Sequence, residues 1–399
     1  MGSEFSFQGR IPPSKSLLNR WLCVGSYARD GGLKILGDST CDDVVKMRGV
    51  LESLARGEPS DCGAAGTVLR FAALRASRLS GRHELRGSAR LFERPQTELL
   101  HLLSMLGVRA ELTPRSLVID SAGWKDPGGE ILVDRSASSQ FASGLLLNAW
   151  ELDFPLNVKS SERSVSDAYL EMTLAVVRQA GMKVEIRPGG WRVAAHQCVS
   201  ATKAHPEPDM SSAFAVAALA AVGGKAVLES FPETSLQPDF VFLEILQRMG
   251  AHVKREASSV HIQKAPLKGV EWNLRDCPDL FPVLGVLCAL AEGPSRLYGA
   301  EHLVHKESNR IAHTATLIRR LGREVIEAGD GLRISAGSLP QASLAFDYDS
   351  DEDHRLVMAG AVARWAGFDV NILRPNCVAK SYPEFLQIAE IPSAGKVSI

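Results

Sequence analysis

The sequence lacks the features that would direct it to a membrane, to nucleic acid or to an export route. No run approaches the roughly 20 apolar residues that span a bilayer, and residues 1–10 lack the apolar core of a signal peptide. The 45 Lys and Arg residues nearly balance 46 Asp and Glu residues, for a formal net charge of −1. No overall basic field therefore favours nucleic acid or an anionic membrane. We expect a cytoplasmic protein in which any anion-binding site depends on a few nearby side chains and not on the overall charge.

Paired cysteines are also missing. The chain has seven cysteines, an odd number, and they lie far apart with no CxxC motif. This pattern argues against a disulfide framework and against a zinc knuckle. We expect reduced thiols that mostly fill the core.

What the sequence does contain is a long internal repeat. With 399 residues and 45% hydrophobic composition, it can bury a large core, and its length favours two domains. An amphipathic helix, a glycine and two strands joined by a tight turn recur in four places. The four glycines, each at a position suited to a left-handed helix C-cap, are Gly107, Gly181, Gly250 and Gly322.

These glycines recur about every 70 residues, which is far longer than the 20 to 50 residues of a solenoid repeat. The spacing predicts a few large α/β modules. An earlier helix over 44–57 has no such hairpin after it, so we expect the first module to be trimmed. Between the repeats lie helices that are apolar on nearly every face, which predicts burial. Their polar residues gather at the N-termini, where the helix dipole favours an anion.

Several short segments carry side chains suited to anionic ligands or to proton transfer. Lys15, Ser16 and Arg20 stand in or near the first turn of a helix that follows two prolines, and Arg94 precedes a proline in an extended position. Asp279 opens a buried helix, and Glu307 lies between cations, where a carboxylate can serve as acid or base. Taken singly, each segment is also explained by an ordinary helix cap or a solvated charge.

Taken in order, eight segments resemble the signature motifs of EPSP synthases, from about residue 9 to residue 385. They read PPSKSLLNR, GAAGTVLR, RLFERP, SSQ, PDLFP, HKESNR, DHRLVM and CVAKSYP, starting at Pro12, Gly63, Arg90, Ser138, Pro278, His305, Asp353 and Cys377. This resemblance implies an α/β enolpyruvyl transferase fold built from six βαβαββ repeats, an inside-out α/β barrel. It also implies a continuous domain over 14–207, a second domain formed by 1–13 with 208–399, and an active site in the cleft between them.

The same resemblance implies the chemistry. The 5-hydroxyl of shikimate 3-phosphate attacks the central carbon of phosphoenolpyruvate, the methylene carbon gains a proton and phosphate leaves, with no metal or cofactor. Asp279 would be the base, Glu307 the proton donor with Lys306 beside it, and Lys15 a further catalytic cation. The residues implied to hold shikimate 3-phosphate are Lys15, Ser16, Arg20, Ser138, Ser139, Gln140, Ser166, Asp279 and Lys306. Those implied to hold phosphoenolpyruvate are Lys15, Gly66, Arg94, Gln140, Arg310, Arg355 and Lys380.

Two departures from the family pattern bear on efficiency. Ala64 stands where the family usually has Asn, and Asn309 stands where it usually has Asp. The related UDP-N-acetylglucosamine enolpyruvyl transferases use a cysteine on a mobile loop, and no matching segment is present here. A degenerate homologue that binds a shikimate-like ligand without turnover, or a transferase for another acceptor, stays open as an alternative. We expect a monomer that acts on small molecules, with neither nucleic acid nor membrane as partner.

Overall fold

The chain folds into two compact units, which are described here one at a time. The computed structural model describes residues 4–29, 32–136, 138–337 and 344–391. Unit 1 comprises Met1–Pro12 and Glu207–Ile399, and unit 2 comprises Pro13–Pro206. The chain passes between the units at two places, each one residue away from a boundary implied by the resemblance.

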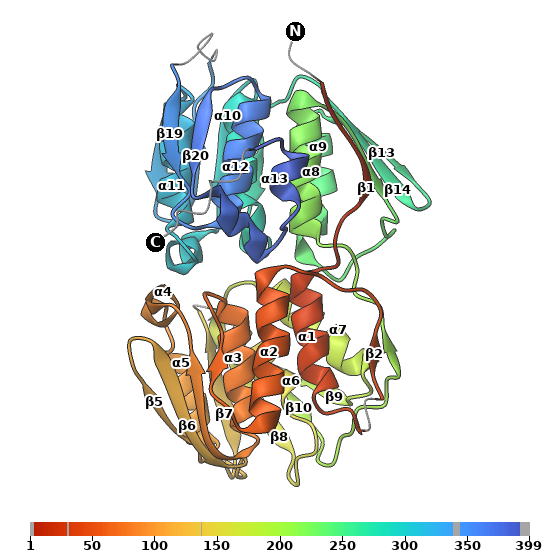
Figure 1. Ribbon diagram of the computed structural model, residues 1–399, viewed down its shortest axis with the longest axis vertical. Helices are drawn as coiled ribbons and strands as arrows, with labels where there is room; N and C mark the ends of the chain where they lie inside the picture. The colour runs from red at the N-terminus through yellow and green to blue at the C-terminus, as the bar shows by residue number, and fades with distance from the viewer. Residues whose placement is uncertain (1–3, 30–31, 137, 338–343, 392–399) are drawn as a thin grey trace. The chain divides into compact units, whose positions relative to one another are not determined.

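Unit 2 contains three repeats (Figure 1). The short repeat consists of β11 (Lys203–Ala204), α1 (Lys15–Gly25), β2 (Lys34–Ile35) and α2 (Asp42–Arg56). The next consists of β3 (Ser60–Asp61), α3 (Gly66–Ala76), β4 (Ser80–Arg86), α4 (Ala89–Glu93), α5 (Thr97–Met105), β5 (Arg109–Leu112) and β6 (Ser116–Ala122). The third consists of β7 (Glu130–Arg135), α6 (Gln140–Leu147), β8 (Leu156–Ser164), α7 (Asp167–Gln179), β9 (Val184–Arg187) and β10 (Gly190–Val193).

Unit 1 repeats the same plan. Its first repeat consists of β1 (Phe5–Arg10), α8 (Met210–Gly223), β12 (Gly224–Glu229), the 3₁₀ helix η2 (Pro238–Val241), α9 (Phe242–Arg248), β13 (His252–Glu256) and β14 (Ser259–Gln263). The second consists of β15 (Glu271–Asn273), η3 (Pro278–Leu280), α10 (Phe281–Leu290), β16 (Ser295–Tyr298), η4 (Glu301–His305), α11 (Arg310–Arg320), β17 (Val325–Ala328) and β18 (Gly331–Ile334). The short third repeat consists of β19 (Phe346–Asp349), α12 (His354–Trp365) and β20 (Val370–Leu373), followed by η5 (Pro375–Lys380) and α13 (Phe385–Ile388).

The described strands form four four-stranded sheets and two two-stranded sheets, one sheet for each repeat. In each four-stranded sheet, two parallel strands are followed by an antiparallel hairpin, as in the order β3-β4-β6-β5. The strand β1, red in Figure 1, pairs in parallel with β12 of unit 1. Within unit 2, β11 pairs in parallel with β2. The six-repeat α/β fold expected from the sequence is confirmed.

The hairpin glycines are confirmed at all four positions. Gly107, Gly181, Gly250 and Gly322 have φ angles of 73°, 103°, 89° and 81°, in the left-handed region that costs glycine least. Each ends a helix and leads into an antiparallel hairpin. The trimmed first module is also confirmed, because α2 passes directly to β3. In the described part of the last repeat, β19 and β20 likewise form a two-stranded sheet, which the sequence analysis did not anticipate.

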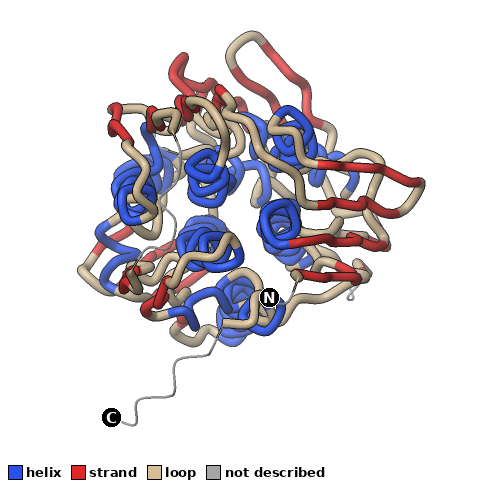
Figure 2. The backbone as a smooth tube through the Cα atoms, turned by 90° about the horizontal axis from the view of Figure 1, so that it is seen from above, coloured by secondary structure: helices blue, strands red, loops and turns tan. Residues whose placement is uncertain are grey.

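Helices lie toward the middle and strands toward the outside in the end-on view of Figure 2, and the most enclosed helices of unit 1 are α8, α10 and α12. The residues of α8 from Met210 to Val222 are all buried, and α10 and α12 are nearly as enclosed. Helix α12 packs against both α8 and α10. Because such helices have no solvent-facing side, they are apolar all round. Their polar first turns are therefore held in fixed positions by the core.

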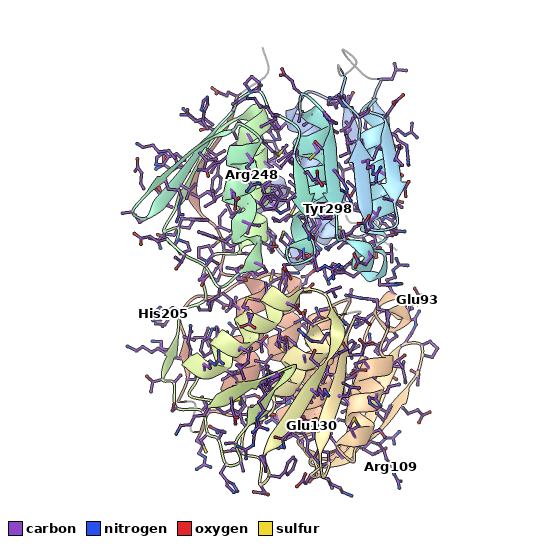
Figure 3. The ribbon with its side chains drawn as sticks, turned by 180° about the vertical axis from the view of Figure 1, so that it is seen from behind. Glu93, Arg109, Glu130, His205, Arg248 and Tyr298 are labelled. Atoms are coloured by element: carbon purple, nitrogen blue, oxygen red, sulfur yellow. The ribbon has the colours of Figure 1, made fainter. Side chains whose placement is uncertain are left out.

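Charged side chains lie on the outside of each unit, including those of Arg109, Glu130 and Arg248 (Figure 3). All seven cysteines are free thiols, and five of them are buried. Across the described ranges, we find no helix with the length and apolar character needed to cross a membrane.

Candidate functional site

Arg310 is the centre of a buried charge cluster in unit 1. Its side chain is only 1% exposed, and it opens α11. Its Nε lies 2.8 Å from Oδ2 of Asp353, its Nη1 lies 2.8 Å from Oδ1 of Asp279, and its Nη2 lies 3.2 Å from Oε2 of Glu307. Burial alone would lower the pKa of Arg310, but these three carboxylates together raise it well above its usual value. The guanidinium therefore stays charged and fixes all three carboxylates.

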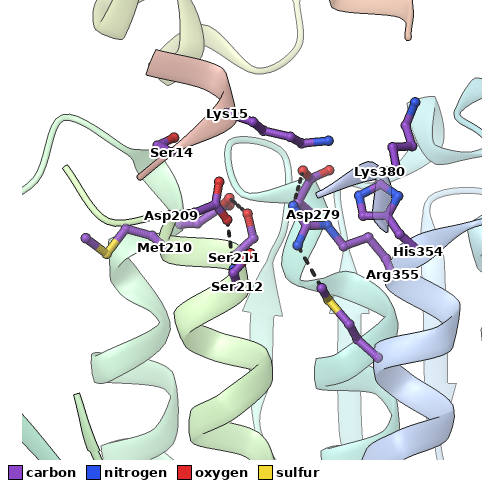
Figure 4. Close-up of polar contacts among 12 residues, drawn as sticks. Ser14, Lys15, Asp209, Met210, Ser211, Ser212, Asp279, His354, Arg355 and Lys380 are labelled. Atoms are coloured by element: carbon purple, nitrogen blue, oxygen red, sulfur yellow. Dashed lines mark hydrogen bonds and ion pairs between the residues drawn. The ribbon is translucent and has the colours of Figure 1, made fainter. Parts of the chain in front are cut away.

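Asp279 links Arg310 to a second buried arginine. Its Oδ2 lies 3.1 Å from Nη2 of Arg355, whose side chain is 1% exposed, as Figure 4 shows. Arg355 lies in the first turn of α12, where Asp353 is the N-cap. Asp279 itself is 21% exposed, so its carboxylate is accessible while its orientation is fixed by two guanidinium groups. Fixed orientation and access are what a general base requires.

Glu307 also lies between two cations. Besides Arg310, its Oε1 lies 3.7 Å from Nζ of Lys380, which ends η5. Lys306 directly follows η4 and is half-buried. The pKa of nearby His302 is lowered to about 3, mainly by burial and next by the positive charge of Lys306. The three cations Arg310, Arg355 and Lys380 thus lie within one connected set of ion pairs, which suits an anionic ligand.

Two further carboxylates belong to this part of unit 1. Asp209 caps α8, where its Oδ1 accepts a hydrogen bond of 2.9 Å from the backbone N–H of Ser212 (Figure 4). Asp239, in η2, accepts a hydrogen bond of 2.8 Å from Oγ of Ser211. Burial raises the pKa of Asp239 to about 7, and the negative charge of Asp279 adds to the effect. The sequence analysis did not single out either residue.

In unit 2, Lys15 opens α1 and pairs with Asp43 of α2, with 2.7 Å between Nζ and Oδ2. Ser14 is the N-cap of α1, so the polar start expected of this helix is present. Arg20 is 2% exposed and donates to Oγ1 of Thr173 at 2.8 Å and to the backbone oxygens of Ser16 and Tyr169. Burial lowers the pKa of Arg20 to about 10, so it still carries its charge near neutral pH.

A second buried arginine of unit 2, Arg70, organises the start of α6. Its Nη1 donates to Oε1 of Gln140 at 2.7 Å and to Oγ of Ser138 at 3.4 Å, and its Nη2 donates to the backbone oxygen of Pro95 at 3.0 Å. The guanidinium carbon lies 4.6 Å from the centre of the Phe141 ring. Arg70 therefore joins the SSQ segment to the segment that carries Arg94.

Gly66 and Arg94 are in close contact. A Cβ atom placed on Gly66 would lie 2.8 Å from Nη1 of Arg94, so the guanidinium packs directly over the glycine. Arg94 has the extended backbone that the following proline predicts, with φ −68° and ψ 148°. The helical backbone of Gly66 does not need a glycine for its own conformation. The close approach of Arg94 is the reason for a glycine at this position.

The remaining serines lie at helix starts. Ser139 is buried and precedes α6, where the backbone N–H of Gln140 donates to Oγ of Ser138 at 3.2 Å. Ser166 precedes α7 with a left-handed backbone, φ 57°, and its side chain makes no capping hydrogen bond. Ser166 therefore does not cap α7 through its side chain. A strained non-glycine conformation of this kind costs roughly 1–3 kcal/mol and is often found at functional sites.

The predicted residues divide into two groups, one in each unit, and the contacts described above join most members of the first group and several members of the second. Unit 1 groups Asp279, Lys306, Glu307, Arg310, Arg355 and Lys380, and unit 2 holds Lys15, Ser16, Arg20, Gly66, Arg94, Ser138, Ser139, Gln140 and Ser166. Sequence reasoning did not single out four charged residues that contact members of these groups or lie near them: Asp43, Arg70, Asp239 and Asp353. The sequence did contain a pattern that could have identified Asp239, since Asp209, Asp239 and Asp279 each follow a proline at a helix start. Within the described ranges, His, Cys, Asp and Glu form no cluster suited to a metal ion.

Comparisons with known proteins agree with these observations. Residues 29–388 match the family model described as EPSP synthase (3-phosphoshikimate 1-carboxyvinyltransferase). The chain is 33% identical to a 3-phosphoshikimate 1-carboxyvinyltransferase of Methanocorpusculum labreanum, over 96% of each chain. It is 31% identical to the protein of the same name from Korarchaeum cryptofilum, over 95% of this chain and 94% of the relative.

Solved structures show the same fold. The EPSP synthase of Acinetobacter baumannii superposes with a TM-score of 0.75 at 22% identity, over 98% of this chain and 96% of that one. The enolpyruvyl transferase NikO of Streptomyces tendae superposes with a TM-score of 0.74 at 16% identity, over 98% and 95%. The six-repeat architecture is therefore shared well beyond the range of close sequence similarity.

Proposed function

Because the chain belongs to the EPSP synthase family, and is thus a transferase of the shikimate pathway, we propose that the two residue groups described above carry out its reaction. The substrates would be phosphoenolpyruvate and shikimate 3-phosphate, and the products 5-enolpyruvylshikimate 3-phosphate and inorganic phosphate. The observation that carries this proposal is the Asp279–Arg310–Glu307 arrangement, in which one buried guanidinium holds two accessible carboxylates.

The first step needs a base, and we assign it to Asp279. Its carboxylate removes the proton from the 5-hydroxyl as that oxygen forms a bond to the central carbon of phosphoenolpyruvate. Two guanidinium groups, of Arg310 and Arg355, hold the carboxylate at 2.8 and 3.1 Å. Such fixed geometry lets the base act without first being reoriented.

The same step needs an acid at the methylene carbon, and we assign it to Glu307 with Lys306 beside it. In the structure, Glu307 pairs with Arg310 and Lys380. An anionic substrate that pairs with these two cations would weaken their attraction for the Glu307 carboxylate. Glu307 could then hold a proton more readily. Return of a proton from the new methyl group to Glu307 re-forms the double bond as the carbon–oxygen bond to phosphate breaks.

The cations are assigned to the negative charges of the substrates. In our proposal, Lys15, Arg94, Arg310, Arg355 and Lys380 hold phosphoenolpyruvate, close to the backbone of Gly66. A further set holds shikimate 3-phosphate: Ser16, Arg20, Ser138, Ser139, Gln140 and Ser166. Hydrogen bonds from charged donors to carboxylate or phosphate are about twice as strong as neutral ones. Local cations therefore explain anion binding by a chain whose net charge is −1.

The test measures phosphate release from phosphoenolpyruvate with and without shikimate 3-phosphate. Asp279→Asn and Glu307→Gln should each lower kcat by about 10²- to 10⁴-fold, the usual contribution of a general acid or base, with folding retained. The exposed carboxylates Asp276 and Glu301 give matched controls, Asp276→Asn and Glu301→Gln, that should stay near wild type.

Three other outcomes would change the assignment. Near-normal turnover in Asp279→Asn or Glu307→Gln would remove that residue from its role. Folded wild-type protein that binds both substrates but releases no phosphate would indicate a binding protein without turnover. Release that requires a different acceptor would indicate another enolpyruvyl transferase. A monomeric state in the cytoplasm stays a prediction.

A further inference from the structure

Asp239 occupies the same kind of position as the proposed base Asp279. Asp209, Asp239 and Asp279 each follow a proline and lie at the start of a helix of unit 1, namely α8, η2 and η3. Helix α8 packs against η2, η3 and α12. Three carboxylates from three helix starts therefore lie around the first turn of α12, which carries Arg355.

The surroundings of Asp239 are closed. Its side chain is 3% exposed, and its hydrogen-bond donor Ser211, at 2.8 Å, is buried as well. The charged groups that act on it are Asp279 from η3, Arg355 from α12 and Asp209 from the start of α8. Figure 4 shows the side chains of Asp209, Ser211, Asp279 and Arg355 at these helix starts. Asp239 is thus a buried carboxyl group that lies beside a charged cluster.

The three cations of the cluster already have carboxylate partners other than Asp239. The cations Arg310, Arg355 and Lys380 form ion pairs with the carboxylates of Asp279, Glu307 and Asp353. A further negative charge, enclosed by protein and beside Asp279 and Asp209, would be costly. Burial and the charge of Asp279 raise the pKa of Asp239 to about 7, although Arg355 and the Ser211 hydroxyl act in the opposite direction.

We propose that Asp239 is a positioning residue that holds a proton when phosphoenolpyruvate binds, so that Arg355 stays directed to Asp279 and to the substrate. The inference rests on the functions proposed above for Asp279 and Arg355. When Asp239 loses its proton, its negative charge competes for Arg355 and repels the anionic substrate. Binding of phosphoenolpyruvate is therefore coupled to protonation of a residue that does not touch it.

The first experiment compares the pH dependence of KM for phosphoenolpyruvate in wild type and Asp239→Asn. Asparagine keeps the shape of the protonated side chain without its titration. In wild type, KM should rise on going from about pH 6 to about pH 8, by up to about tenfold for each pH unit above the pKa. In Asp239→Asn the rise over the same interval should be smaller, while kcat at about pH 6 stays within about twofold of wild type. Equal pH dependence of KM in the two proteins would overturn the proposal.

A second variant tests the hydrogen bond. Ser211→Ala removes the donor that favours the charged form of Asp239. The rise of KM should then begin at a higher pH than in wild type. A shift in the opposite direction would contradict the assigned contact. The exposed Asp369 supplies the control, since Asp369→Asn should keep the wild-type profile.

The third measurement does not depend on activity. An unfolded Asp titrates near 3.9, whereas the folded pKa of Asp239 is about 7. The folded state binds the extra proton between these values, so stability contributed by Asp239 is full at low pH and falls as pH rises through this range. The Tm of Asp239→Asn, relative to wild type, should increase between about pH 5 and pH 8. An unchanged difference would refute proton retention, even if Asp279 is the base. If instead Asp279→Asn retains turnover, Asp279 loses its assignment as the base, and if wild type releases no phosphate, the proposed function fails; the Tm result for Asp239 stands in either case.

Discussion

Asp353 and Arg310 form an ion pair that is completely enclosed by unit 1, with 2.8 Å between Oδ2 and Nε and side chains that are 0% and 1% exposed. Asp353 also accepts a hydrogen bond of 3.1 Å from Oγ of Ser308 and caps α12 through the backbone N–H of Arg355. It therefore fixes the two arginines that hold Asp279. Sequence reasoning assigned both arginines but not the carboxylate that anchors them.

Asp353→Ala should strongly destabilise unit 1. Removing one partner of a buried pair leaves the other charge uncompensated, at a cost of about 3–5 kcal/mol. The free energy of unfolding in urea would measure this loss. Asp369→Ala, at an exposed position, serves as the control and should change stability by less than about 0.5 kcal/mol. A loss for Asp353→Ala no larger than that of the control would show that Arg310 does not depend on this pair.

Arg70→Lys should lower kcat/KM without unfolding unit 2. Lysine keeps the charge but cannot reproduce the guanidinium contacts to Gln140, Ser138 and the backbone of Pro95. Misplaced ligand-binding groups should cost about 10- to 100-fold in kcat/KM. Arg75→Lys on the same helix is the control, since Arg75 stacks on Tyr27 instead. Equal activity of the two variants would show that Arg70 does not position the SSQ segment.

Gly66→Ala should raise KM for phosphoenolpyruvate and leave stability intact. The added methyl would lie 2.8 Å from Nη1 of Arg94, so the guanidinium must move. Loss of one charge-assisted hydrogen bond is worth about 1.5–3 kcal/mol, or about 10- to 100-fold in KM. In the control, Gly49→Ala in α2, the new methyl meets nothing within 4 Å. Since alanine favours helices at both positions, only the first variant should lose affinity.

His302 should make the protein sensitive to acid. It is buried, and neither ring nitrogen has a hydrogen-bond partner among the residues that the structure describes. Burial, with the charge of Lys306, lowers its pKa to about 3, against an unfolded value near 6.5. The unfolded state therefore binds more protons between these values, and stability falls as pH falls through that range, by up to about 1.4 kcal/mol for each pH unit.

The measurement is the free energy of unfolding between about pH 7 and pH 4.5. His302→Leu should lose less stability on acidification than wild type, because its neutral side chain does not titrate. His305→Leu, at an exposed position, should follow the wild-type curve. Parallel curves for wild type and His302→Leu would assign the acid sensitivity to other groups.

The sequence by itself determined the features that depend on local conformation. Gly107, Gly181, Gly250 and Gly322 marked four hairpins, because a left-handed helix end favours glycine wherever it occurs. The polar first turns of the apolar helices could be predicted for the same reason. A short segment is enough to show that a helix is apolar on all sides and that its N-terminus carries groups that attract anions. These local rules, with the order of eight motifs, were enough to predict the fold and to choose the candidate site residues.

Tertiary structure decided which residues hold the site in place. The pairing of Arg70 with Gln140, of Arg310 with Asp353 and of Asp239 with Ser211 joins segments that are distant in sequence. The sequence does not show whether solvent or protein surrounds a charged side chain. Only when the charge is buried does the protein depend on its partner. The short last repeat, β19 with β20, was not anticipated, although the same absence of a hairpin marked the first module as trimmed. Burial and long-range contact, which no local pattern encodes, separate the residues that could be predicted from those that could not.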